Sequence, residues 1–140
     1  MSKFVEVTGC FETHLTLEAP DLDQIRGFGS SHELKITHII LGNGRHPSQP
    51  MLTGRADGRL SDVLEKLQTT SALLSDLRVR VLRTKVETTT DNPAAPKDDH
   101  EAAHRPATWH FEHHVKLLLA PETDRSVIES IAKRHSARFS

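Results

Sequence analysis

The sequence predicts an α+β protein, a two-layer sandwich with helices on one face of an antiparallel sheet. The predicted architecture is a ferredoxin-like β-α-β-β-α-β core extended by a C-terminal β-α unit. Segments with period-2 alternation of polar and apolar residues, typical of strands, and segments with helical spacing follow one another in that order. In addition, residues 11–20 (FETHLTLEAP) recur as residues 111–121 (FEHHVKLLLAP), and each copy leads into a helical pattern. The length of 140 residues fits a single domain, residues 1–140.

The first strand is predicted over Val5–Leu17, because the odd positions are mostly apolar and the even positions mostly polar. Gly9 interrupts the apolar row and indicates a bulge or bend. A short helix follows Pro20, with its apolar residues at helical spacing: Leu22, Ile25 and Phe28.

The next two strands are predicted as a hairpin. Residues 34–41 (LKITHIIL) are rich in β-branched side chains, and residues 42–47 (GNGRHP) are typical of a turn. Residues 48–54 (SQPMLTG) form a short return strand in this interpretation. Pro50 places it at a sheet edge or marks the start of the strand.

The clearest helical pattern begins near residue 60, where Ser61 is the predicted cap. Its apolar stripe comprises Leu60, Val63, Leu64, Leu67, Leu74 and Leu77. Residues 78–87 (RVRVLRTKVE) then alternate as a strand with a phase slip near Leu82.

The last part of the chain is predicted to be a flexible loop followed by a strand and a helix. Residues 88–108 contain three prolines and almost no large apolar side chain, which favours a flexible loop. Residues 109–119 alternate as a strand that would pair antiparallel with the 78–87 strand. The final helix follows Pro121, with Val127, Ile128, Ile131 and His135 at helical spacing.

The strand phases gather polar side chains on the sheet face opposite the helices. The repeat has an even offset of 100, so both copies point the same way: His110 takes the place of Cys10, Glu112 that of Glu12, and His114 that of His14. Side chains two residues apart on a strand stand ~6.6–6.8 Å apart, so each strand contributes a row. The predicted face comprises Cys10, Glu12, His14, Arg83, Lys85, Glu87, His110, Glu112, His114 and Lys116.

One interpretation of this face is a divalent metal site. Imidazole, thiolate and carboxylate groups are the ligand types of Zn²⁺, and imidazole with carboxylate also suits Mn²⁺, whereas Mg²⁺ prefers oxygen. The predicted metal ligands are His14, His110, His114 and Cys10. Lysine and arginine on the same face count against this site, because they repel a metal ion.

A second interpretation is a small anionic ligand, for example a phosphorylated one, held by Arg83, Lys85, Lys116 and the histidines. Three glutamates would orient these cations or bind a Mg²⁺ ion that accompanies the phosphates: Glu12, Glu87 and Glu112. Residues 112–116 (EHHVK) resemble the ExExK strand of the triphosphate-tunnel (CYTH) enzymes. That resemblance implies a phosphorylated ligand with Mg²⁺. It covers five residues, with His114 in place of the second glutamate, and the first copy lacks the lysine.

A third interpretation needs no ligand. Alternating charges on an exposed sheet face form cross-strand ion pairs that each contribute only ~0.2–1 kcal/mol. In that case the protein is a non-catalytic interaction module, and the polar face or the edge strand at 48–54 forms a homo-oligomer. The sequence does not distinguish a small enzyme from such a module.

Composition narrows the classes of partner. A formal net charge of −1, no tyrosine and one tryptophan disfavour nucleic-acid binding. No apolar run approaches the ~20 residues that cross a bilayer, so no membrane contact is expected. A single cysteine, Cys10, excludes an internal disulfide, and with an N-terminus unlike a signal peptide it predicts a cytoplasmic protein.

Overall fold

A computed structural model describes residues 4–18, 21–40 and 48–139. The chain divides into two compact units, Met1–Ala107 and Thr108–Ser140. Each unit is described by itself below, and the single domain over residues 1–140 stays a prediction.

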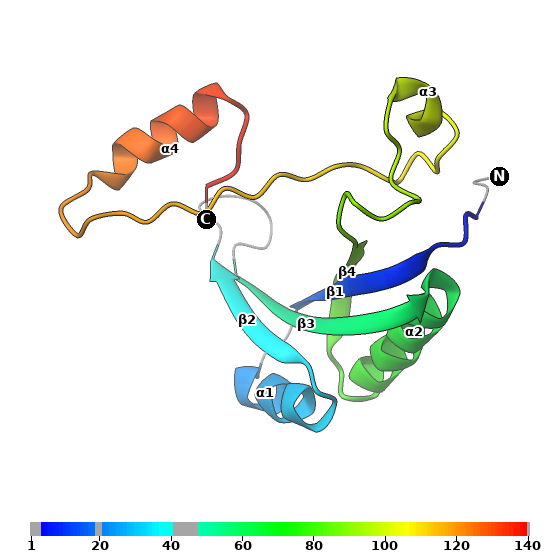
Figure 1. Ribbon diagram of the computed structural model, residues 1–140. Coiled ribbons are helices and arrows are strands. Elements are labelled where there is room, and N and C mark those ends of the chain that lie inside the picture. The colour runs from blue at the N-terminus through cyan, green and yellow to red at the C-terminus, as the bar shows by residue number, and fades with distance from the viewer. Residues whose placement is uncertain (1–3, 19–20, 41–47, 140) are drawn as a thin grey trace. The chain divides into compact units, whose positions relative to one another are not determined.

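The first unit contains the elements β1 (Thr8–Glu18), α1 (Leu22–Ser31), β2 (Lys35–Ile40), β3 (Ser48–Arg59), α2 (Leu60–Asp76), β4 (Arg80–Glu87) and the short α3 (Asp99–Ala102). The order of the first six is β-α-β-β-α-β, as the sequence predicts. The strands form one antiparallel sheet in the order β2-β3-β1-β4. Helices α1 and α2 both lie on one side of this sheet (Figure 1). The α+β class is therefore confirmed.

The core lies between the sheet and these two helices. In β1 the odd positions Phe11, Leu15 and Leu17 are buried, and they face the helices. The fully buried side chains are Leu15, Leu17, Ile25, Leu52 and Leu74. Burying each of them contributes roughly 1.5–3 kcal/mol, so this packing fixes which face of β1 points away from the helices.

Strand β3 differs from its prediction. It runs over twelve residues and lies between β2 and β1, so residues 48–54 are not an edge strand. Pro50 is the third residue of this strand, opposite His38 of β2 and one residue before the pairing with β1 begins at Met51. On the helix-facing side its second half carries only Gly54, Ala56 and Gly58, which conceal the alternation. The predicted turn at 42–47 lies outside the described residues.

Helix α2 begins at Leu60, two residues earlier than a Ser61 cap requires. Its N-cap is Arg59, which makes no side-chain capping bond. The backbone N–H of Ser61 donates instead to the Glu6 carboxylate at 3.1 Å. The hydrogen bonds from Ser61 hold the pKa of the Glu6 carboxyl below its usual range. A carboxylate from outside the helix thus supplies the cap.

The predicted phase slip in β4 is confirmed. Thr16 pairs with Arg83 and Leu17 with Val81, so Leu82 is the extra residue of a β-bulge. After the bulge, Lys85 and Glu87 lie opposite His14 and Glu12.

The segment that follows β4 is held to β1 by side chains. The Asn92 amide is buried and donates to the Thr8 carbonyl oxygen at 3.1 Å, and the Thr88 hydroxyl donates to the Cys10 carbonyl oxygen at 2.9 Å. A Cβ on Gly9 would lie 2.4 Å from the Asn92 amide nitrogen. Gly9 therefore permits a close approach rather than forming the predicted bulge. The flexibility of residues 88–108 stays a prediction.

The second unit contains helix α4 (Arg125–Arg134), which confirms the predicted final helix. Residues 109–119 belong to no strand or helix, so the predicted C-terminal extension of the sheet is not confirmed. An alternating pattern makes a strand only when a neighbouring strand accepts its backbone hydrogen bonds. Within the described residues 108–139 there is no such neighbour.

No described helix has both the length and the apolar character needed to cross a membrane.

Candidate functional site

Three strands present polar side chains on the sheet face that points away from α1 and α2, here called the polar face. His14 lies on the central strand β1, with Thr53 of β3 opposite on one side and Lys85 of β4 opposite on the other. Two register positions away, Glu12 lies between Arg55 and Glu87. The even positions of β1 reach this face because the odd positions are buried beneath the helices.

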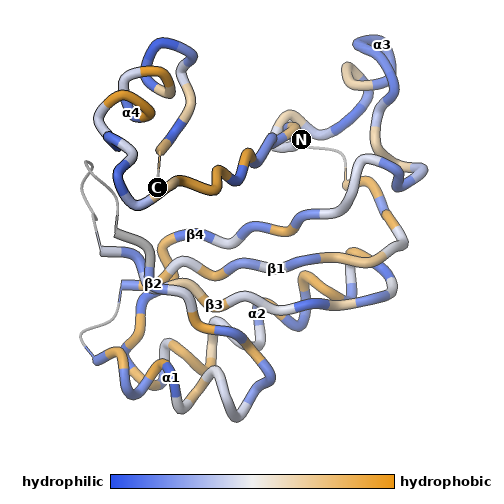
Figure 2. The backbone as a smooth tube through the Cα atoms, turned by 60° about the vertical axis from the view of Figure 1, so that its left-hand side comes forward, coloured by the Kyte–Doolittle hydropathy of each residue, from blue (hydrophilic) through white to orange (hydrophobic). Residues whose placement is uncertain are grey.

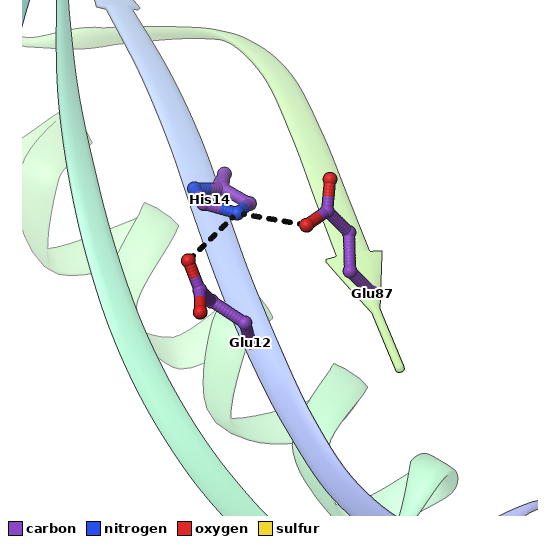
Figure 3. A group of neighbouring side chains, drawn as sticks. All are labelled: Glu12, His14 and Glu87. Carbon is purple, nitrogen blue, oxygen red and sulfur yellow. Dashed lines mark ion pairs between the residues drawn. The ribbon is translucent and has the colours of Figure 1, made fainter. Parts of the chain in front are cut away.

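His14 is the centre of this group. Its Nε2 atom lies 3.5 Å from Glu12 Oε1 and 3.4 Å from Glu87 Oε2 (Figure 3). Its Nδ1 atom hydrogen-bonds with the Thr53 hydroxyl at 2.9 Å. The side chain is only 12% exposed. Both ring nitrogens therefore have defined partners, and the two carboxylates converge on one nitrogen.

One ligand atom from each of Glu12, His14 and Glu87 lies within 4.8 Å of the other two. The two carboxylates facing one nitrogen attract a positive charge between them. A proton on the imidazole or a metal ion would satisfy them.

The cations on this face contact the outer oxygens of the same carboxylates. Lys85 Nζ contacts Glu87 Oε1, whereas the other oxygen, Oε2, faces His14. Arg55 Nε lies 4.0 Å from Glu12 Oε2, and its side chain is largely exposed. The inner oxygen of each glutamate thus remains directed at His14, so the predicted repulsion by Lys85 is offset by its contact with Glu87.

A wide depression of about 550 Å³ lies beside this group. Its walls come from β1, β2 and β3 and include the cationic Lys35 and Arg55. Its lining residues are Glu12, His14, Glu33, Lys35, Thr37, Met51, Thr53, Gly54 and Arg55. A ligand in this depression would contact His14 from the side opposite β4.

Cys10 does not join the group. It is exposed and lies opposite Asp57 of β3, two register positions from Glu12. A hydrogen bond to the Asp57 carboxylate raises the pKa of the Cys10 thiol. A raised pKa opposes the thiolate form that a metal ligand or nucleophile needs.

The predicted residues from the second copy of the repeat lie in the second unit. There Glu112 Oε1 lies 2.9 Å from His110 Nε2, and Glu112 Oε2 lies 3.3 Å from His114 Nε2. The arrangement is the reverse of that at His14, since one carboxylate serves two imidazoles. Lys116 is exposed, and Arg83 lies opposite Thr16 on the polar face of the first unit.

Sequence reasoning missed Thr53 and Lys35. Both come from strands whose register with β1 is set by tertiary pairing, and Lys35 pairs with Thr53 rather than with β1. The only indication of Thr53 in the sequence was the alternation of residues 51–53. Leu52 is buried beneath the helices, so its neighbour Thr53 points to the other face of the sheet.

No family model matches this chain, and it has no match among the curated proteins or the solved structures.

Proposed function

We propose that the protein binds a divalent metal ion through Glu12, His14 and Glu87 on the polar face. The observation that carries this proposal is the convergence of both carboxylates on His14 Nε2, at 3.5 and 3.4 Å. Two ligands of a tetrahedral ion at the usual ~2.0–2.2 Å bond lengths stand ~3.3–3.5 Å apart. Each of these two nitrogen–oxygen separations is longer than a good hydrogen bond and fits two ligands of one ion, and the carboxylate oxygens lie within 4.8 Å of each other.

The same distances favour Zn²⁺ over Mg²⁺. An octahedral Mg²⁺ at ~2.0–2.1 Å brings neighbouring ligands to about 3 Å and prefers oxygen. One imidazole with two carboxylates suits Zn²⁺ and also Mn²⁺. Three protein ligands leave at least one position for water or for a further ligand.

Two neighbours support the ligands. If Nδ1 of His14 donates its proton to the Thr53 hydroxyl, the lone pair of Nε2 is free for the metal. Lys85 holds the outer oxygen of Glu87 and leaves Oε2 for the ion. Metal ligands in proteins are commonly oriented by such hydrogen bonds.

The proposal includes an anionic ligand at the open position of the metal. The depression beside His14 is lined by Lys35 and Arg55, whose charges suit a carboxylate or phosphate, and by the acidic Glu12 and Glu33, of which Glu12 is a proposed metal ligand. No reaction is assigned to this arrangement.

We also propose that the first unit has the ferredoxin-like topology. Its element order and its strand order β2-β3-β1-β4 support this, because β3 lies between β1 and β2 as in a split β-α-β unit.

The alternative is the interaction module, in which the polar face is a lattice of ion pairs. Exposed pairs such as Arg80 with Glu18 and Arg55 with Glu12 favour it. Such pairs contribute only ~0–1 kcal/mol and need no ligand.

Zinc titration of the chelator-treated protein, followed by calorimetry and native mass spectrometry, separates the two. We expect one Zn²⁺ per chain. His14→Ala should weaken binding at least ~100-fold, because loss of even an outer-shell partner costs ~10–100-fold. Thr53→Val should cost ~10–100-fold with the three ligands intact.

His38→Ala is the matched control, since His38 is an exposed histidine of β2 that bonds to Ser48 at 2.7 Å, away from the group. Zinc affinity that is unchanged in His14→Ala and Glu87→Gln would refute the site and favour the ion-pair lattice. His114→Ala tests separately whether the second copy of the repeat contributes a ligand.

A further inference from the structure

The structural likeness of the two copies of the repeat extends beyond the strand pattern. Helix α1 covers Leu22–Ser31 and helix α4 covers Arg125–Arg134, so both have ten residues and stand 103 positions apart. Each is preceded by an aspartate whose side chain accepts backbone N–H bonds of the first turn, Asp21 in one and Asp124 in the other.

The two helices also end alike. The C-cap is His32 in α1 and His135 in α4, and the following residues, Glu33 and Ser136, both have positive φ, at 57° and 54°. In each case a 2.8 Å backbone bond closes the motif, from Leu34 to Gly29 and from Ala137 to Ala132. Helix α2 ends with the same kind of motif, so the ending alone is common. The two helices thus share length and caps at a constant offset of 103, so Thr108–Ser140 matches β1-α1 in its sequence pattern and in its helix, although residues 109–119 form no strand.

The second unit lacks the cover that the first has. Phe11, Leu15 and Leu17 are 5%, 2% and 0% exposed, whereas their counterparts Phe111, Val115 and Leu117 are 55%, 80% and 52% exposed. In α4 no residue is buried, although Ile128 and Ile131 stand where α1 has the buried Ile25 and Phe28. Figure 2 shows hydrophobic residues both in the extended segment before α4 and within α4. Several large apolar side chains exposed on one small unit indicate an interaction site.

The first unit shows what covers a β-α unit. Strand β1 pairs antiparallel with β3, and β3 itself runs directly into helix α2 on the same side of the sheet. Part of the surface that buries β1-α1 thus comes from a second β-α unit, β3-α2, whose strand is antiparallel to β1. Two copies of Thr108–Ser140 can form the same arrangement by a two-fold axis.

We propose that residues 108–139 are the docking surface for a second copy of this chain. Segment 109–119 pairs antiparallel with the same segment of the other copy, and the two α4 helices cover one face of the resulting ribbon. With His114 at the axis, Glu112 of one copy stands opposite Lys116 of the other, and Phe111 stands opposite Leu117. The pair of Glu112 and Lys116 corresponds in charge to Glu12 opposite Arg55 in the first unit. Each contact occurs twice in an isologous dimer.

Sedimentation velocity of the full chain in the presence of chelator tests this proposal without interference from the metal site. We expect a dimer that Leu117→Asp converts to a monomer. Lys116→Glu should weaken the dimer about tenfold or more, because two attractive cross-strand pairs become repulsive. The double variant Glu112→Lys with Lys116→Glu should restore the dimer, since both pairs are attractive again with their signs exchanged.

Far-UV circular dichroism shows whether each variant retains the fold of the first unit. A wild-type chain that is monomeric up to ~1 mM, the weak limit of specific association, would overturn the proposal and leave the surface to a different polypeptide. A dimer that persists in Leu117→Asp, or that the double charge exchange does not restore, would overturn it too.

Discussion

Helices α1 and α4 begin after an aspartate, run for ten residues and end at a histidine followed by a residue with positive φ. The segments before them share the letters FE-x-H, yet residues 8–18 are the central strand of a sheet and residues 109–119 belong to no strand. Local hydrogen bonds form the caps and ends of both helices in the same way. A strand needs partners from elsewhere in the chain: β1 pairs with β3 and β4, whereas the described residues 108–139 contain no strand. The comparison shows that a segment's own residues specify its helix and caps, whereas its neighbours decide whether an alternating segment becomes a strand.

The largest expected effect of this difference is on stability. Leu17→Ala should lower the free energy of unfolding of the first unit by ~2–5 kcal/mol, because the side chain is fully buried and a cavity remains. Leu117→Ala, its counterpart, should change that free energy by no more than ~0.5 kcal/mol, as for an exposed position. Urea unfolding at low protein concentration, followed by far-UV circular dichroism, measures both. Equal losses would show that residues 109–119 belong to the same core, and the comparison would fail.

A smaller effect is expected at Gly9, whose counterpart in the second copy is Trp109. In Gly9→Ala the new methyl group would lie 2.4 Å from the Asn92 amide, so Asn92 must move and lose its bond to Thr8. We expect a loss of ~1–3 kcal/mol, from strain and from a buried amide without its partner. Thermal unfolding measures the change.

Gly27→Ala is the control for this substitution. Gly27 lies in α1, and a Cβ there would meet nothing within 4 Å. Alanine is the better helix former, so this variant should be more stable by ~0.5–1 kcal/mol. If Gly9→Ala is as harmless as the control, the contact between Asn92 and β1 does not anchor the segment after β4.

The difference between local signals and tertiary pairing also explains how far the sequence could predict the fold. Periodicity predicted α1, α2 and α4, and the break in phase at Leu82 predicted the bulge in β4. The second half of β3 was missed because Gly54 and Gly58 carry no apolar side chain to reveal the alternation. Gly54 is small for a tertiary reason: a Cβ there would lie 2.7 Å from Leu34 and 3.1 Å from Thr13.

The candidate site was predictable where it depends on strand phase. Even positions of β1 and the shifted phase of β4 placed Glu12, His14 and Glu87 on one face, and the structure brings these three together. Thr53 was not predictable, because its place beside His14 depends on the register between β1 and β3. The place of Cys10 outside this group of three was not predictable either, since strand phase alone does not show that Asp57 lies opposite it.

The smallest expected effect concerns the start of α4. Hydrogen bonds from the Ser126 hydroxyl and backbone N–H lower the pKa of the Asp124 carboxyl below its usual 3.8. Because the pKa is lower in the folded helix, the capping stabilisation is complete above pH 3.8 and is lost as the pH falls through the lowered value. In Asp124→Asn the amide oxygen can still cap the helix and does not titrate. We therefore expect amide chemical shifts of residues 125–128 to titrate below pH 3.8 in the wild type and to stay constant in the variant, in NMR spectra recorded from pH 6 downward. An identical titration in both proteins would mean that another group controls the start of α4, and that the likeness of its cap to that of α1 is only geometric.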